Sequence, residues 1–228
     1  MKLSIVMPVY NEENTLAKIV DKVEKVSINK ELILVDDGSK DNTKEIMNKL
    51  SKKYKNIRLF YHEKNKGKGS AIRTGIKHIT GGIMVIQDGD LEYNPEDFKR
   101  LIKPILEGKS KVVYGSRVLG KIKGFKIASH YIGNIFLSLI TMFLYLRRIT
   151  DMETCYKMMT RDVINSISLK SKRFDIEPEI TAKIIKKGYK IIEIPIIYNS
   201  RSFEEGKKIK MRDGFIALYC LLKYRFFD

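Results

Sequence analysis

The sequence predicts an α/β domain with a mostly parallel sheet that is covered by helices on both faces. Short apolar runs of strand length alternate with segments of helical periodicity, and polar clusters follow three of these runs. The runs are Leu3 to Met7, Leu32 to Val35, Ile57 to Tyr61, Ile83 to Ile86 and Val112 to Tyr114. Strands that alternate with helices are typical of parallel sheets, because a parallel pair needs a crossover connection. A Rossmann-like plan therefore follows.

Helical patterns occupy the segments between the apolar runs. Apolar residues recur there at the three- and four-residue spacing that places side chains on one face of a helix. The clearest examples are Leu16, Ile19, Val20 and Val23, and then Phe98, Leu101, Ile102 and Ile105. Each helix is thus expected to cover the sheet with one apolar face.

Composition places the chain among globular proteins with an anionic partner. The 228 residues fit one domain, and the net charge of +17 implies a nucleic acid, a membrane surface or a phosphorylated substrate. We expect no nucleic-acid binding, because no helix-turn-helix, zinc-finger or RNP motif is visible. Cys155 and Cys220 are far apart and the N-terminus has no secretory signal, so we expect a reduced, cytoplasmic setting.

Polar clusters follow the first, second and fourth apolar runs. They read PVYNEE, DDGSKDN and QDGDLE. Taken singly, each is also compatible with a turn or a helix cap. Ligands of open parallel sheets bind beyond the carboxyl ends of the strands, so we expect the three clusters to converge on one crevice.

The third cluster is the strongest indication of a metal site. Asp88, Asp90 and Glu92 lie within five positions, and neighbouring carboxylates repel one another unless a cation relieves them. An EF-hand is excluded because the loop lacks the spacing of its acidic ligands. Mg²⁺ or Mn²⁺ fits better, since these ions take few protein oxygens and leave positions for a diphosphate.

The ordered set PVYNE, VDDGS and QDGDLE resembles glycosyltransferase family two, whose nucleotide-sugar transferases have the GT-A fold. Four later motifs resemble the branch that contains the dolichyl-phosphate mannose and glucose synthases. These motifs are GSR at 115–117, TDMETCYK at 150–157, RFDIEPEITAK at 173–183 and SRSFEEGKKI at 200–209. The resemblance spans almost the whole chain and implies one GT-A domain over residues 1–228.

The resemblance also implies roles for the donor-side residues. Asp88 would lie near the sugar and ribose, and Asp90 and Glu92 would hold the metal on the diphosphate of a GDP- or UDP-linked sugar. Family members often carry Gln where this chain has Glu92, which adds a negative charge. The residues implied around the base and ribose are Pro8, Tyr10, Glu12 and Asp37, with Asp36 close by.

The segment Lys66-Gly67-Lys68-Gly69 precedes a helical pattern that begins near Ser70. A glycine-rich turn at a helix N-terminus can receive phosphate, and the resemblance places this segment beside the nucleotide. The alternative is a flexible basic loop. We take Lys66 and Gly67 as candidate donor contacts, and Lys208 as a candidate for reaching the diphosphate.

A lipid phosphate is the acceptor that the resemblance implies, with inversion at the sugar. Such a phosphate is already ionised near neutral pH, so no residue needs to remove a proton from it. Arg117 and Arg201 are the candidates for clamping the acceptor and donor phosphates, because a guanidinium grips two oxygens at once. Lys126 and Ser129 are candidates for assisting the acceptor. The alternative is a hydroxyl acceptor, with Asp151 as general base.

Two apolar segments suggest contact with a membrane surface. Tyr131 to Leu146 would form a helix of only about 24 Å, which is shorter than the ~30 Å hydrocarbon core. With its basic flanks it predicts an interfacial helix at 128–148, and a second amphipathic pattern lies at 212–227. We therefore expect peripheral association with an anionic cytoplasmic membrane face. The alternatives are packing on the domain core, on a second copy or on a membrane partner subunit.

Overall fold

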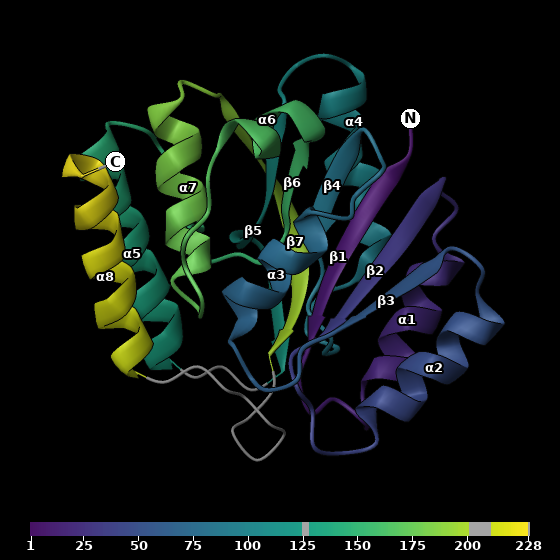
Figure 1. The fold of residues 1–228 in the computed structure, drawn as a ribbon. Coiled ribbons are helices and arrows are strands. Elements are labelled where there is room, and N and C mark those ends of the chain that lie inside the picture. The colour runs from purple at the N-terminus through teal and green to yellow at the C-terminus, as the bar shows by residue number, and fades with distance from the viewer. Residues whose placement is uncertain (125–127, 201–210, 228) are drawn as a thin grey trace.

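A seven-stranded sheet organises the part of the chain that the computed structural model describes, residues 1–124, 128–200 and 211–227 (Figure 1). The strand order is β3-β2-β1-β4-β6-β5-β7. The strands are β1 (Leu3–Val9), β2 (Lys30–Asp36), β3 (Ile57–Tyr61), β4 (Ile83–Ile86), β5 (Val112–Gly124), β6 (Lys157–Thr160) and β7 (Ile191–Ser200). The helices are α1 (Leu16–Lys25), α2 (Thr43–Lys53), α3 (Lys68–Ile76), α4 (Phe98–Leu106), α5 (Ala128–Tyr145), α6 (Arg161–Ser166), α7 (Ile176–Lys186) and α8 (Met211–Phe226).

The sheet is mostly parallel, as predicted. β1 runs parallel to β2 and β4, β2 to β3, and β5 to β7, whereas β6 is antiparallel to both β4 and β5. All five predicted strands are present, and the sequence analysis missed β6 and β7. β6 has only four residues and begins with a lysine, while β7 is an edge strand that contains Pro195. Neither therefore has the continuous apolar run that marks a strand buried on both faces.

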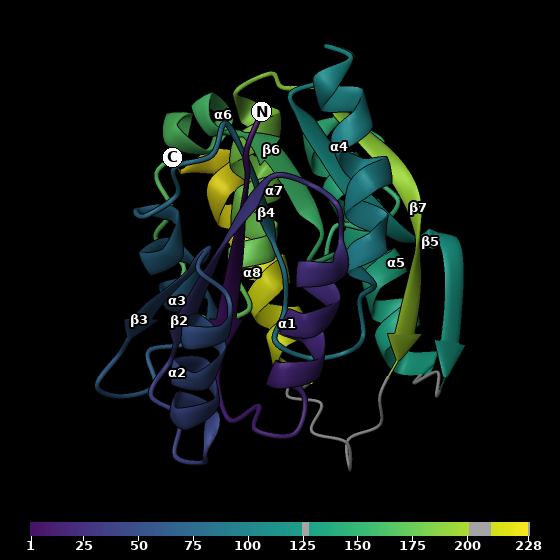
Figure 2. The same cartoon turned by 90° about the vertical axis from the view of Figure 1, so that its right-hand side faces the viewer.

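Helices cover both faces of the sheet (Figures 1 and 2). α1, α2 and α4 lie on one face, and α3 and α7 lie on the other. Leu3, Ile5 and Val6 of the central strand β1 are fully buried, because apolar side chains meet helices on both sides of it. Because β1 is parallel to β2 and β4, the carboxyl ends of these strands point to the same end of the molecule, where the polar clusters follow.

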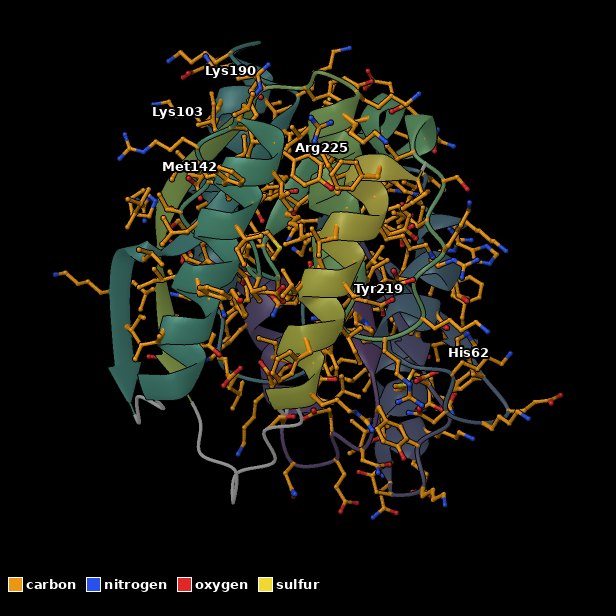
Figure 3. The ribbon with its side chains drawn as sticks, turned by 90° about the vertical axis from the view of Figure 1, so that its left-hand side faces the viewer. His62, Lys103, Met142, Lys190, Tyr219 and Arg225 are labelled. Carbon is orange, nitrogen blue, oxygen red and sulfur yellow. The ribbon has the colours of Figure 1, made fainter. Side chains whose placement is uncertain are left out.

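α5 and α8 form an outer layer against α7. A second apolar cluster joins these three helices through their facing side chains; its buried members include Leu137, Tyr145, Ile185, Leu221 and Tyr224. Figure 3 looks onto the opposite side of this layer, where α5 and α8 stand side by side. None of the described helices combines the length and the apolar content needed to span a membrane.

Candidate active site

A cavity of about 460 Å³ lies where the predicted polar clusters meet. The three clusters thus converge, as their position after parallel strands predicted. The lining residues come from the end of β1, the loop after β2, the turn before α3, the loop after β4 and the segment before α7. They are Pro8, Val9, Tyr10, Glu12, Asp37, Asn65, Gly67, Lys68, Asp88, Gly89, Asp90, Glu92, Arg173 and Phe174.

Asp37 organises the glycine-rich turn on one wall of the cavity. Its carboxylate accepts hydrogen bonds from the backbone amides of Lys66 (2.9 Å) and Gly67 (2.7 Å), and His62 Nδ1 lies 2.7 Å from Oδ1. Gly67 has φ +96°, and a Cβ atom there would stand 2.3 Å from the carbonyl oxygen of Lys172. Only glycine suits this backbone and this close approach. Asp37 therefore fixes the turn, and Lys66 takes part through its backbone amide.

Asp36 lies underneath the cavity wall. It is fully buried and accepts hydrogen bonds from the Ser39 amide, so it shapes the loop after β2 and does not line the cavity. Glu12 lines the cavity, and its Oε2 accepts from Thr15 Oγ1 at 2.6 Å. The same hydroxyl lies 3.0 Å from the Gly89 carbonyl oxygen and shares its one proton between the two acceptors. The PVYNEE and QDGDLE clusters are thereby tied together.

The three acidic residues of QDGDLE all line the cavity, but they have different neighbours. Asp88 pairs with Lys68, whose Nζ lies 2.8 Å from Oδ1. Asp90 Oδ1 accepts from the Glu92 amide at 3.1 Å, and Glu92 Oε2 accepts from Tyr198 Oη at 2.7 Å. Asp88 is thus paired with a cation, while Asp90 accepts from a backbone amide and Glu92 from a phenol.

Asp90 and Glu92 fit a divalent cation that keeps most of its positions for other ligands. Among the described residues no group of three or more His, Cys, Asp or Glu side chains is placed to hold a metal ion. Two carboxylates at the wall of an open cavity suit Mg²⁺ or Mn²⁺, which commonly complete their coordination with phosphate oxygens and water. These are the two residues that the sequence analysis selected for the metal.

Lys68, Arg173 and Phe174 also line the cavity and were missed by the sequence analysis. Lys68 lies between two carboxylates, because its Nζ is 3.3 Å from Glu177 Oε1 as well as close to Asp88. The signal for Lys68 was present in the KGKG stretch, where the choice between two lysines was not decidable. Position in a turn does not tell which lysine points inward, and the structure shows that Lys68, not Lys66, lines the cavity.

Arg117, which is partly exposed, forms a bidentate pair with the fully buried Asp151. Nε and Nη2 of Arg117 each donate to one oxygen of Asp151 at 2.7 Å, and the Arg117 amide donates to Oδ2 at 2.8 Å. Asn134 of α5 donates to Oδ1 at 2.9 Å. The guanidinium also lies 5.2 Å from the ring centre of Tyr198, the residue that contacts Glu92. The Tyr198 side chain therefore links Arg117 to Glu92, one of the two candidate metal ligands.

This pairing makes Asp151 a poor general base. The side chain is fully buried, and burial alone would favour its neutral form. The adjacent Arg117 guanidinium and its hydrogen bonds prevail and hold the pKa of Asp151 below its ordinary value. A base needs an accessible lone pair and a pKa near the working pH, and Asp151 has neither.

Four predicted residues cannot be placed in the site. Lys126, Arg201 and Lys208 lie outside the described residues. Ser129 belongs to the first turn of α5, but its side chain lies outside the described part.

The sequence model of the family described as "Glycosyl transferase family 2" matches residues 4–168. The chain belongs to glycosyltransferase family 2. The family expected from the motifs is thus confirmed, and with it the expectation of a glycosyltransferase.

Curated relatives in family 2 match the branch that the later motifs resemble. The chain is 31% identical over 214 residues to a dolichol-phosphate mannosyltransferase from Pyrococcus furiosus, with 91% of this chain and 59% of the relative covered. It is also 31% identical to a UDP-N-acetylglucosamine–dolichyl-phosphate N-acetylglucosaminyltransferase from Methanococcus voltae, covering 96% and 94%. A dolichyl-phosphate β-glucosyltransferase from Trichomonas vaginalis is 30% identical, covering 92% and 68%.

Solved structures confirm the GT-A fold. Glucosyl-3-phosphoglycerate synthase from Mycobacterium tuberculosis in complex with UDP superposes with a TM-score of 0.75 at 17% identity, covering 98% of this chain and 80% of that one. The same enzyme with Mn²⁺, UDP and glucosyl-3-phosphoglycerate gives 0.74 at 19% identity, covering 98% and 79%. Likeness at this identity concerns the fold.

Proposed function

We propose that the protein transfers a single sugar, with inversion, from a UDP- or GDP-linked donor to a polyprenyl phosphate. The proposal rests on two groups of opposite charge, one for the donor and one for the acceptor. An acidic wall with Asp90 and Glu92 suits the cation of a nucleotide diphosphate, and the Arg117 guanidinium beside it suits an anionic acceptor.

The acceptor chemistry follows from what the site offers. A phosphate oxygen is already charged and attacks the anomeric carbon without a base, so the occupied and buried Asp151 is no obstacle. A hydroxyl acceptor would need a base, and the depressed pKa of Asp151 disfavours that alternative. Asp151 instead orients Arg117 for two-point contact with phosphate oxygens.

The donor is held by groups that line the cavity described above. Asp37 and Glu12 present carboxylate oxygens that accept from ribose hydroxyls, and Asp88 and Lys68 stand where the sugar would lie. A Mg²⁺ or Mn²⁺ ion held by Asp90 and Glu92 would neutralise the leaving diphosphate. Glucosyl-3-phosphoglycerate synthase has been solved with Mn²⁺ or Mg²⁺ and UDP, which supports this cofactor.

The names of the relatives favour a lipid-phosphate acceptor, although the chain spans only 59% of the Pyrococcus furiosus enzyme. The direct test is incubation with polyprenyl phosphate, MnCl₂ or MgCl₂ and a panel of GDP-mannose, UDP-glucose and UDP-N-acetylglucosamine. A glycolipid should form from the phosphate and not from the free polyprenol. Equal glycosylation of the alcohol would overturn the proposed acceptor.

We further propose that the outer face of α5 and α8 rests on an anionic membrane at the cytoplasmic side. Large apolar side chains are exposed along both helices and directly after each of them; they are Ile132, Phe136, Leu139, Met142, Phe143, Leu146, Phe215, Tyr219, Leu222, Phe226 and Phe227. Arg147, Arg148, Lys223 and Arg225 are also exposed. Figure 3 shows Met142 on α5 and Tyr219 and Arg225 on α8 at this face. Apolar residues rimmed by cations suit a membrane interface with anionic headgroups.

Vesicle binding tests the membrane proposal and separates it from the competing occupants. Liposomes with anionic lipid should retain the protein, and salt should weaken retention without abolishing it, since apolar burial adds to charge. Phe143→Asp with Phe215→Asp should abolish retention. If the protein does not bind the liposomes but sediments as a dimer, this face is the contact with a second copy. If it does not bind them and is a folded monomer, a membrane partner subunit is favoured.

A further inference from the structure

Lys157 is a fully buried lysine whose ammonium is shared between two parts of the site. Its Nζ donates to the carbonyl oxygens of Met152 (2.8 Å) and Thr154 (2.5 Å) and lies 2.9 Å from Glu177 Oε2. The side chain is 0% exposed. A buried ammonium is costly unless it is paired and hydrogen-bonded, and Lys157 has two carbonyl hydrogen bonds and one ion pair. Lys157 therefore has no contact with a substrate.

The two carbonyl contacts of Lys157 lie in the loop that orients Arg117. Asp151 precedes Met152 directly and forms the bidentate pair with Arg117. On its other side the loop is held by Glu193, which accepts from the Asp151 amide at 3.1 Å. The position of the acceptor-side guanidinium thus depends on contacts from β7 and from Lys157.

The carboxylate contact of Lys157 leads to the donor side. Glu177 stands in the first turn of α7 and lies 3.3 Å from Lys68 Nζ through its other oxygen. Lys68 in turn pairs with Asp88, and both line the cavity. An unbroken series of charged groups therefore runs from Asp88 to the loop of Asp151, with Lys157 as the member that bridges the two sides.

We propose that Lys157 is a positioning residue that fixes the acceptor-side Arg117 relative to the donor-side Asp88 and Lys68. This inference rests on the proposed transfer reaction. Attack on an anomeric carbon needs the two reactants within a few tenths of an ångström of the reactive geometry, so a loop that shifts loses rate even when both ligands still bind. Lys157 acts through the groups it holds, and the substrate meets those groups alone.

Two reactions of the same protein separate this role from a purely structural one. Transfer to polyprenyl phosphate needs both sides of the site, whereas slow hydrolysis of the nucleotide sugar by water needs the donor side only. In Lys157→Met the kcat of transfer should fall at least about ten-fold, while hydrolysis and the KM for the donor change less than about three-fold. The transfer-to-hydrolysis ratio is independent of how much protein is folded.

Lys183→Met is the matched control. Lys183 is also buried and paired, with Nζ 2.9 Å from Glu179 Oε1 on the same helix, and it donates to the Ser168 carbonyl and lies 4.5 Å from the Tyr224 ring centre, so these contacts lead to the loop before α7 and to α8. It should lower the Tm and leave the ratio unchanged. If Lys157→Met does not fold, the double variant with Glu177→Gln removes cation and anion together and should fold with a low ratio. A wild-type ratio in either Lys157 variant would overturn the proposal.

The failure of the proposed reaction would remain distinguishable. A wild-type protein that hydrolyses the donor but glycosylates no polyprenyl phosphate would refute the acceptor. The positioning role of Lys157 is then tested by amide hydrogen exchange in the presence of MnCl₂ and a nucleoside diphosphate. The nucleotide used is whichever of UDP and GDP raises the Tm of the protein. Binding should slow exchange over 150–154 in the wild type and in Lys183→Met, but not in Lys157→Met. No slowing in the wild type, or equal slowing in all three, would overturn it.

Discussion

Replacing Glu153 by Gln should make the protein more stable at alkaline pH. Oε1 of Glu153 is buried and has no hydrogen-bond partner among the described residues. Burial is the main reason that its pKa rises from 4.5 to about 7; Glu177 and Asp151 raise it further, whereas Lys157 and Arg117 oppose the rise. The carboxyl is thus kept protonated where an exposed glutamate would be charged.

The sign and size of the effect follow from proton linkage. Between pH 4.5 and 7 the folded state keeps a proton that the unfolded chain releases, so the stability of the wild type falls as pH rises through this window. Each pH unit between the two pKa values corresponds to about 1.4 kcal/mol, which makes the full loss about 3 kcal/mol above pH 7. Glu153→Gln lacks this titration and should not show the loss.

Urea unfolding of both proteins at pH 4 to 8, followed by circular dichroism, measures this difference. The free energy of unfolding of Glu153→Gln relative to the wild type should increase by about 3 kcal/mol across the range. Glu45→Gln, which removes an exposed carboxyl, is the control and should run close to the wild type. If the wild type and Glu153→Gln differ by a constant amount at every pH, Glu153 is ionised in the folded state and the reasoning is wrong.

Three further substitutions test the site. Asp90→Ala should abolish Mn²⁺- or Mg²⁺-supported transfer without lowering the Tm, because it removes a ligand and an acidic repulsion together; full activity in EDTA would contradict the metal assignment. Arg117→Lys should lower kcat at least about ten-fold, because an ammonium cannot reproduce the two-point contact with Asp151. Steady-state kinetics that match the wild type would exclude Arg117 as the acceptor-side residue. Gly67→Ala should lower the Tm and weaken nucleotide binding, since its Cβ would stand 2.3 Å from the Lys172 carbonyl oxygen. Calorimetry with UDP and GDP measures both effects, and unchanged binding would show that this turn takes no part in donor binding.

The sequence alone determined the class of the fold and the end of the sheet that carries the site. Buried strands such as β1 and β4 can be recognised in the sequence, because both of their faces meet apolar helices and their apolar runs are therefore continuous. The polar residues that follow them must leave the core, and parallel strands bring their carboxyl ends together. Asp88, Asp90 and Glu92 could therefore be assigned to one cavity before any coordinates were known.

Only the tertiary structure decided which neighbouring residue does what. The strand pattern does not distinguish Asp36 from Asp37, and only the family resemblance favoured Asp37. Adjacent side chains at a strand end point to opposite sides, and of the two only Asp37 lines the cavity. The pairing of Arg117 with Asp151 joins residues 34 positions apart. Likewise, periodicity marked an apolar face at Phe215 but not whether packing would cover or expose it. Local patterns record burial, whereas pairings between distant residues depend on how the elements pack, and no short stretch of sequence carries that information.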